Sequence, residues 1–144
     1  MKEYKGCKIP EELYYDLEYH VWVKIENDIA IVGATDPAQA YAGELLNIKI
    51  KDIGTKLKRG DIAAIVESAK YMGPMRSPIS GSVIEINQNV SDDPTLINSD
   101  PYENWVLKIK PEKLEEEIKY LVKGSEAYEK YKPIIDKWGV DCKK

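Results

Sequence analysis

The chain repeats one short pattern, first as Gly43-Glu44-Leu45-Leu46-Asn47-Ile48 and again as Gly81-Ser82-Val83-Ile84-Glu85-Ile86. Both copies are rich in strand-forming residues, and each continues through a polar loop, 52–61 or 89–104, to a second apolar stretch. Two similar halves of short strands predict a β-sandwich or flattened barrel with quasi-twofold symmetry. Residues 68–77 would then form an exposed hairpin that links the halves. The alternative is a chance similarity between two strand-forming stretches.

Turn and cap residues predict the elements around this repeat. Asn27-Asp28 is a turn pair that joins strands 22–26 and 28–32 in a hairpin. Thr35, a cap residue, and Pro37 open a short helix that ends at Gly43. Further strands are expected at 45–50, 62–67, 83–87 and 105–110, with a turn at 78–81.

The C-terminal part of the sequence favours helices. Apolar residues at helical spacing predict a helix over 114–122 that ends at Gly124. Ser125 would cap a second helix, which Pro133 would kink or restart. Residues 138–144 are expected to form a frayed tail.

Length and charge limit the class of protein. The 144 residues suit a single domain, with a β domain at 1–110 and a helical extension at 111–144 packed on it. A net charge of −4 and a pI near 5.2 argue against nucleic-acid binding. No apolar run approaches the roughly 20 residues that span a bilayer, so no membrane association is expected. The N-terminus lacks a hydrophobic signal region, which predicts a cytoplasmic protein.

The sequence offers little conventional catalytic material. His20 is the single histidine, so no metal site and no catalytic triad are expected. Cys7 and Cys142 do not form a CxxC pattern. In a reducing compartment they are expected to be free thiols.

One segment resembles a known modification site. Glu67-Ser68-Ala69-Lys70, followed by Ser77-Pro78-Ile79-Ser80-Gly81, resembles the lipoyl-attachment hairpin of glycine cleavage system H proteins. The resemblance runs from about Ile9 through the C-terminal helices and implies a barrel-sandwich hybrid, a flattened β-barrel with an exposed attachment hairpin. Other stretches in the family's order are 9–13, 20–23, 32–39, 43–45, 93–98, 100–102 and 105–109.

The resemblance implies a carrier and not an enzyme, with no catalytic residues of its own. Lys70 would hold lipoate through an amide, so that a flexible arm shuttles a thiol-bound intermediate between partner enzymes. Glu67 and Ser68 would support the hairpin or be recognised by the modifying enzyme. Gly81 would support the turn through a positive φ. The implied partners are a lipoate ligase or lipoyl transferase, glycine decarboxylase, aminomethyltransferase and dihydrolipoyl dehydrogenase.

The residues expected around the arm depart from the family. Val21 follows His20 where the family has Glu, Pro74 stands where Asp is frequent, and Tyr19 adds an aromatic ring. These four residues are the candidates for the arm groove. An apolar groove is poorly matched to a charged aminomethyl group, unless water supplies the missing contacts.

Three other functions remain open. An H-like carrier of sulfur intermediates would work with a heterodisulfide-reductase-like complex, and Met72 and Met75 would suit a soft cargo. A biotinyl carrier shares the hairpin architecture. A small enzyme could use Cys7 or Cys142 as its nucleophile, with His20 as the only base available.

Overall fold

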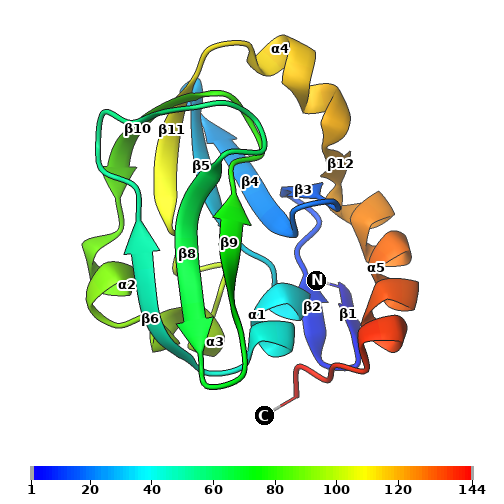
Figure 1. The fold of residues 1–144 in the computed structure, drawn as a ribbon. Helices are drawn as coiled ribbons and strands as arrows, with labels where there is room; N and C mark the ends of the chain where they lie inside the picture. The colour runs from blue at the N-terminus through cyan, green and yellow to red at the C-terminus, as the bar shows by residue number, and fades with distance from the viewer. Residues whose placement is uncertain (1, 144) are drawn as a thin grey trace.

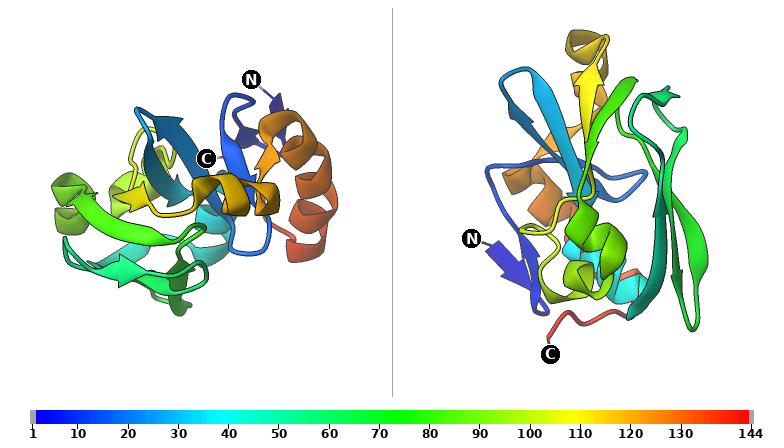
Figure 2. Two further views of the ribbon diagram at one scale, coloured as in Figure 1. Left: turned by 90° about the horizontal axis from the view of Figure 1, so that it is seen from above. Right: turned by 90° about the vertical axis from the view of Figure 1, so that its left-hand side faces the viewer.

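The computed structural model describes residues 2–143, and most of its regular structure is β (Figure 1). A seven-stranded sheet has the order β12-β3-β4-β5-β11-β10-β7, and a three-stranded sheet has the order β6-β8-β9. In Figure 2 the smaller sheet faces β10 and β11 of the larger one. The elements are β1 (Lys2–Tyr4), β2 (Cys7–Ile9), β3 (Tyr14–Asp16), β4 (Val21–Glu26), β5 (Ile29–Ala34), α1 (Asp36–Ala42), β6 (Leu45–Ile50), β7 (Lys56–Leu57), β8 (Ile62–Ser68), β9 (Met72–Arg76), β10 (Gly81–Ile86), α2 (Gln88–Asp92), α3 (Thr95–Ser99), β11 (Leu107–Pro111), α4 (Leu114–Glu117), the 3₁₀ turn η1 (Ile118–Tyr120), β12 (Val122–Lys123) and α5 (Gly124–Trp138).

The predicted fold class, mainly β with C-terminal helices, is confirmed. The two sheets form a flattened sandwich and do not close into a continuous barrel. Aliphatic side chains fill the space between them, because alternate residues of each strand point inward. This core includes Val23, Val32, Ile48, Ala64 and Ile109.

The two half-repeats form equivalent strands in different sheets. β6 pairs antiparallel with β8, and β10 pairs antiparallel with β11. Each pairing has a register shift at the fourth residue of the repeat, Leu46 in one copy and Ile84 in the other. Both side chains are exposed, because an extra residue at a bulge is displaced from the regular alternation. The shared bulge argues against a chance similarity.

The turn and cap predictions near the N-terminus are confirmed. Asn27 and Asp28 have φ of 50° and 62°, the left-handed pair that joins β4 to β5 in a tight hairpin. The Thr35 side chain accepts a hydrogen bond from Ala38 N–H at the start of α1. Gly43, with φ of 84°, ends that helix.

The C-terminal predictions need correction. The expected first helix is only α4 and η1, because β12 then pairs with β3 and extends the chain. Gly124 begins α5 rather than ending a helix, and Ser125 lies inside it. Position 124 needs a glycine, because a Cβ there would overlap Glu11 Cα of the neighbouring segment. Pro133 is accommodated within one continuous helix.

Several elements were not predicted as such, namely β1, β2, β3, β7, β12, α2 and α3, whereas β9 lies within the predicted hairpin 68–77. α5 packs on β1, β2 and β3, where Tyr131 and Ile135 are fully buried. The division into a β domain at 1–110 and a helical extension at 111–144 stays a prediction. β11 ends at Pro111, next to this boundary, but β12 from the C-terminal part joins the large sheet. Among residues 2–143 we find no helix with the length and apolar character needed to cross a membrane.

Candidate attachment hairpin and groove

Lys70 lies at the tip of the β8–β9 hairpin and is exposed. Glu67 and Met72 form the last residue pair of the two strands, and the chain turns through residues 69–71. The Ser68 N–H donates to the carbonyl oxygen of Tyr71 at 2.7 Å, which closes the turn. The tip lies at the end of the molecule that also holds α1 (Figure 1). The amine of Lys70 is therefore presented on a short, hydrogen-bonded turn.

Ser68 attaches this tip to α1. Its side chain is buried, and its hydroxyl donates to the carbonyl oxygen of Ala42 at 2.6 Å. The Ser68 Oγ also accepts a hydrogen bond from Lys70 N–H at 3.3 Å. One side chain therefore connects the residue beside the tip to the last residue of a helix, which restrains the root of the Lys70 side chain.

Gly43 and Asn98 complete the support, although sequence reasoning did not assign them to the site. A Cβ at Gly43 would lie 2.9 Å from Lys70 Cε, so the lysine chain passes over a residue without a side chain. Asn98 Nδ2 donates to Gly43 O at 2.9 Å, and its Oδ1 accepts from Leu45 N–H at the same distance. The glycine that ends α1 was the available sequence signal for this contact.

The other two hairpin candidates lie apart from this support. Glu67 is exposed on β8, two residues outside the turn. Gly81 begins β10, at the opposite end of β9 from the tip (Figure 1). The expected positive φ at Gly81 is wrong. The constraint there is space, since a Cβ would lie 2.2 Å from Lys110 O in the paired strand β11.

All four groove candidates line one cavity of about 260 Å³ beside the hairpin. It lies between α1, the turn from β3 to β4, strand β9 and the end of α5. Asp, Glu, Lys and Arg are absent from this lining as far as the structure describes it. The lining residues are Tyr19, His20, Val21, Ala34, Ala38, Gln39, Tyr41, Ala42, Leu45, Val66, Tyr71, Pro74, Met75, Ile97 and Trp138.

Three aromatic side chains in this lining were not predicted to belong to the site. The Tyr41 ring centroid lies 6.0 Å from that of Tyr71 and 4.8 Å from that of Trp138. Trp138 also packs against His20, with ring centroids 4.7 Å apart. The expectation of a frayed tail over 138–144 is therefore wrong at its start, because Trp138 ends α5 with its ring in the groove. Residue 144 of that stretch lies outside the described residues.

His20 lies in the groove with a backbone φ of 59°. Its Nδ1 is 3.0 Å from the hydroxyl of Tyr131, a buried residue of α5. Burial lowers the pKa of His20 below its ordinary value of 6.5, because a charged imidazole loses its hydration there. At neutral pH the side chain is uncharged.

Tyr19 is held at the edge of the groove by Arg59. The guanidinium Nη1 donates to Tyr19 Oη at 3.1 Å, and Nη2 pairs with Asp16 at 2.7 Å. The same group lies over the rings of Tyr19 and Tyr120, 4.7 and 4.6 Å from their centroids. Arg59 thus links Tyr19, at the edge of the groove, to Asp16 of β3 and Tyr120 of η1.

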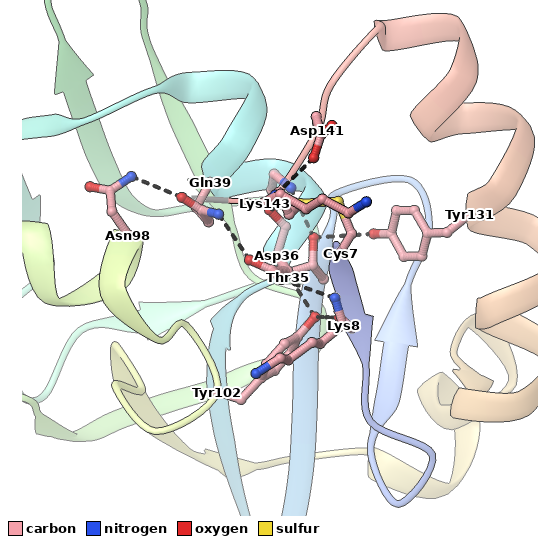
Figure 3. The surroundings of a disulfide bond; sticks show 12 residues. Cys7, Lys8, Thr35, Asp36, Gln39, Asn98, Tyr102, Tyr131, Asp141 and Lys143 are labelled. Carbon is pink, nitrogen blue, oxygen red and sulfur yellow. Dashed lines mark hydrogen bonds between the residues drawn. A yellow bond between two sulfur atoms is a disulfide. The ribbon is translucent and has the colours of Figure 1, made fainter. Parts of the chain in front are cut away.

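Cys7 and Cys142 form a disulfide, so the expectation of free thiols is wrong (Figure 3). Their Cα atoms are 4.7 Å apart although 135 positions separate them in sequence. Cys142 N–H donates to Lys5 O, which fastens the C-terminal segment to the turn between β1 and β2. A thiol enzyme would have no free cysteine to use, and this reading is set aside.

Comparison with known proteins identifies similar sequences over nearly the whole chain. A family model described as "Glycine cleavage H-protein" matches residues 13–134. "Glycine cleavage system H protein 2" of Aquifex aeolicus is 46% identical over 144 residues, covering 99% of this chain and 89% of that protein. "Probable glycine cleavage system H protein" of Pyrococcus furiosus is 44% identical over 132 residues, covering 91% and 97%.

A solved structure is also similar. The crystal structure of a glycine cleavage system H protein from Mycobacterium marinum matches with a TM-score of 0.73 and 26% sequence identity. The match covers 85% of this chain and 98% of that one. Trp138 and Cys142, in contrast, lie beyond the residues that the family model matches.

Proposed function

The chain belongs to the glycine cleavage H-protein family, whose members are lipoate-bearing carriers and not enzymes, and we propose that it carries lipoate on Lys70. The observation that carries this proposal is the exposed Lys70 amine on a hydrogen-bonded tip, directly beside an apolar groove. An amide to lipoate requires an accessible amine, and the exposed tip provides one.

The surroundings of Lys70 fit an attached arm. Ser68 and Gly43 would hold its root, the first by hydrogen bonds and the second by leaving room for the lysine chain. The cavity of about 260 Å³ is slightly below the range for drug-sized ligands and suits the small end of an arm. When bound, the lipoyl group supplies the dithiol that takes up and releases the transferred group.

We infer glycine cleavage as the pathway, with the aminomethyl group as cargo. The partners would be a lipoate ligase or lipoyl transferase, then glycine decarboxylase, aminomethyltransferase and dihydrolipoyl dehydrogenase. A tethered arm reaches successive partners at high effective concentration. A cytoplasmic location stays a prediction; the Cys7–Cys142 disulfide is uncommon for cytosolic proteins outside hyperthermophiles.

The comparisons support neither a biotinyl carrier nor a sulfur carrier acting with a heterodisulfide-reductase-like complex. The two methionines that suggested a soft cargo also differ in position. Met72 is exposed on the hairpin, and Met75 is buried in the groove lining, so they do not form one sulfur-rich surface. We therefore retain the aminomethyl cargo.

Intact-mass measurement after incubation with a lipoate ligase, lipoate and ATP tests the attachment site. We expect one added lipoyl group on the wild type and none on Lys70→Arg. The arginine keeps the positive charge but lacks the primary amine that forms the amide. Lys49→Arg, an exposed lysine on β6, is the matched control and should be modified like the wild type. Modification that persists in Lys70→Arg would contradict the proposal.

A further inference from the structure

The groove has an aromatic wall built from three separate parts of the chain. Tyr41 comes from α1, Tyr71 from the hairpin turn beside Lys70, and Trp138 from the last position of α5. Their neighbouring ring centroids are 4.8 and 6.0 Å apart, so the rings contact one another and form a continuous surface. Tyr41 is 46% exposed, which leaves part of this wall open to a group on the arm.

The wall matters because the groove is uncharged. An ammonium group that enters an apolar cavity loses hydration and needs a compensating partner. No acidic side chain lines the cavity among the described residues, and no basic side chain repels a cation there. His20 remains neutral at pH 7, since burial lowers its pKa. On the proposed function, amide formation also removes the charge of Lys70 at the root of the arm.

The faces of Trp and Tyr rings attract cations through their quadrupoles, and aromatic surfaces recognise ammonium groups in this way. We propose that Trp138, Tyr41 and Tyr71 hold the ammonium end of the cargo in the groove, in place of a carboxylate. This inference rests on the proposed function. It explains how a groove without acidic residues retains a charged cargo.

Trp138 is the central member of the wall, since its ring contacts both Tyr41 and His20, with centroids 4.8 and 4.7 Å apart. It lies outside residues 13–134, the part that the family model matches. Two features fix the end of α5, where Trp138 lies. Gly139, with φ of 67°, caps α5 directly after it, and Cys142 is bonded to Cys7 a few residues further on. Trp138 is therefore the last residue of a packed helix and is followed closely by a disulfide.

Two artificial arms that differ only in charge test the wall without requiring lipoylation. Lys70→Cys introduces a thiol at the tip, which is alkylated with a flexible chain of lipoyl-lysine length ending in a primary ammonium or a hydroxyl. Mass mapping confirms a single label and an intact Cys7–Cys142 disulfide. The docked fraction is read from NMR shifts of the Ala38 and Ala42 amides, which belong to residues that line the groove.

We expect the ammonium arm to dock about two- to fivefold more than the hydroxyl arm, the range for an exposed cation–π contact. Trp138→Leu or Tyr41→Leu should abolish this preference, and Trp138→Phe should retain most of it. Tyr128→Leu is the matched control, since Tyr128 lies on α5 like Trp138 and does not line the groove. Equal docking of the two arms, or a preference that survives both leucine variants, would overturn the inference. Failure of lipoylation on Lys70 would instead overturn the proposed function.

Discussion

Ser68 shows how one polar side chain sets the position of the candidate attachment residue. It is buried between the hairpin and α1, and both of its strongest contacts are with backbone groups. A buried hydroxyl whose hydrogen bonds are satisfied stabilises the folded state. If it is removed, the buried backbone groups that it bonded lose their partner, and this lowers the free energy of unfolding.

Ser68→Ala should destabilise the protein by about 1–3 kcal/mol, because the carbonyl of Ala42 loses its donor in a buried site. It should also slow lipoylation of Lys70, because the tip becomes less ordered. Urea unfolding and the initial rate of modification measure the two effects. Ser125→Ala, an exposed position on α5, should change neither. Unaltered stability in Ser68→Ala would show that the contact does not hold the tip.

His20 predicts a pH dependence of stability. Its folded pKa is lowered by burial, so the unfolded chain takes up this proton at a higher pH than the folded one. Stability should therefore be full at pH 7 and should decrease as the pH falls through about 6.5, before most carboxylates titrate. Urea unfolding between pH 7.5 and 5.5 measures this slope.

The single histidine makes this slope assignable. His20→Gln should give a flat profile over the same range, whatever its absolute stability. A wild-type profile that is flat, or that rises towards pH 5.5, would contradict a depressed pKa at this position.

At the scale of elements, β10 depends on a close approach to β11. Gly81 pairs with Pro111 on one side and Leu57 on the other, and the neighbouring strand leaves no room for a methyl group. This constraint belongs to the core of the sandwich. The attachment tip lies at the other end of the β8–β9 hairpin.

Gly81→Ala should lower the free energy of unfolding by about 1–3 kcal/mol through overpacking against Lys110 O. Lipoylation of the folded fraction should proceed at the wild-type rate, because Ser68 and Gly43 are not disturbed. Denaturant unfolding and intact-mass kinetics separate these effects. Slower modification of fully folded Gly81→Ala would show that this strand also supports the tip.

At the scale of the whole molecule, the Cys7–Cys142 disulfide links the two ends of the chain (Figure 3). It closes nearly the entire sequence into one loop, and long loops lose the most entropy in the unfolded state when they are closed. The bonded ends lie at the start of α1, where Tyr102 Oη donates to Lys8 O and accepts from Asp36 N–H at 3.0 Å.

Loss of the disulfide should destabilise the protein by roughly 3–5 kcal/mol and lower its melting temperature by about 10 °C. Thermal unfolding of the oxidised wild type against Cys7→Ser/Cys142→Ser measures this difference. The double variant should still be lipoylated on Lys70, because the hairpin contacts do not involve the disulfide. Equal melting temperatures would show that the linkage does not constrain the unfolded chain.

The local elements followed from the sequence alone, because their causes are local. Thr35 and Gly43 predict the start and end of α1, and Asn27-Asp28 predicts a hairpin turn. The repeated strand pattern predicts the sandwich. Lys70 was identified by its surrounding motif, and Tyr19, His20, Val21 and Pro74 were grouped through the family resemblance. Their common cavity was then found in the structure.

Only the tertiary structure decided what joins these elements. Trp138 and Cys142 read as a tail in the sequence, since nothing nearby in the chain shows what they contact. α5 packs across β1 to β3, which brings Trp138 to Tyr41 and Cys142 to Cys7. Contacts between residues so distant in sequence depend on how the layers pack, and the hydrophobic core that sets this packing has no local signature.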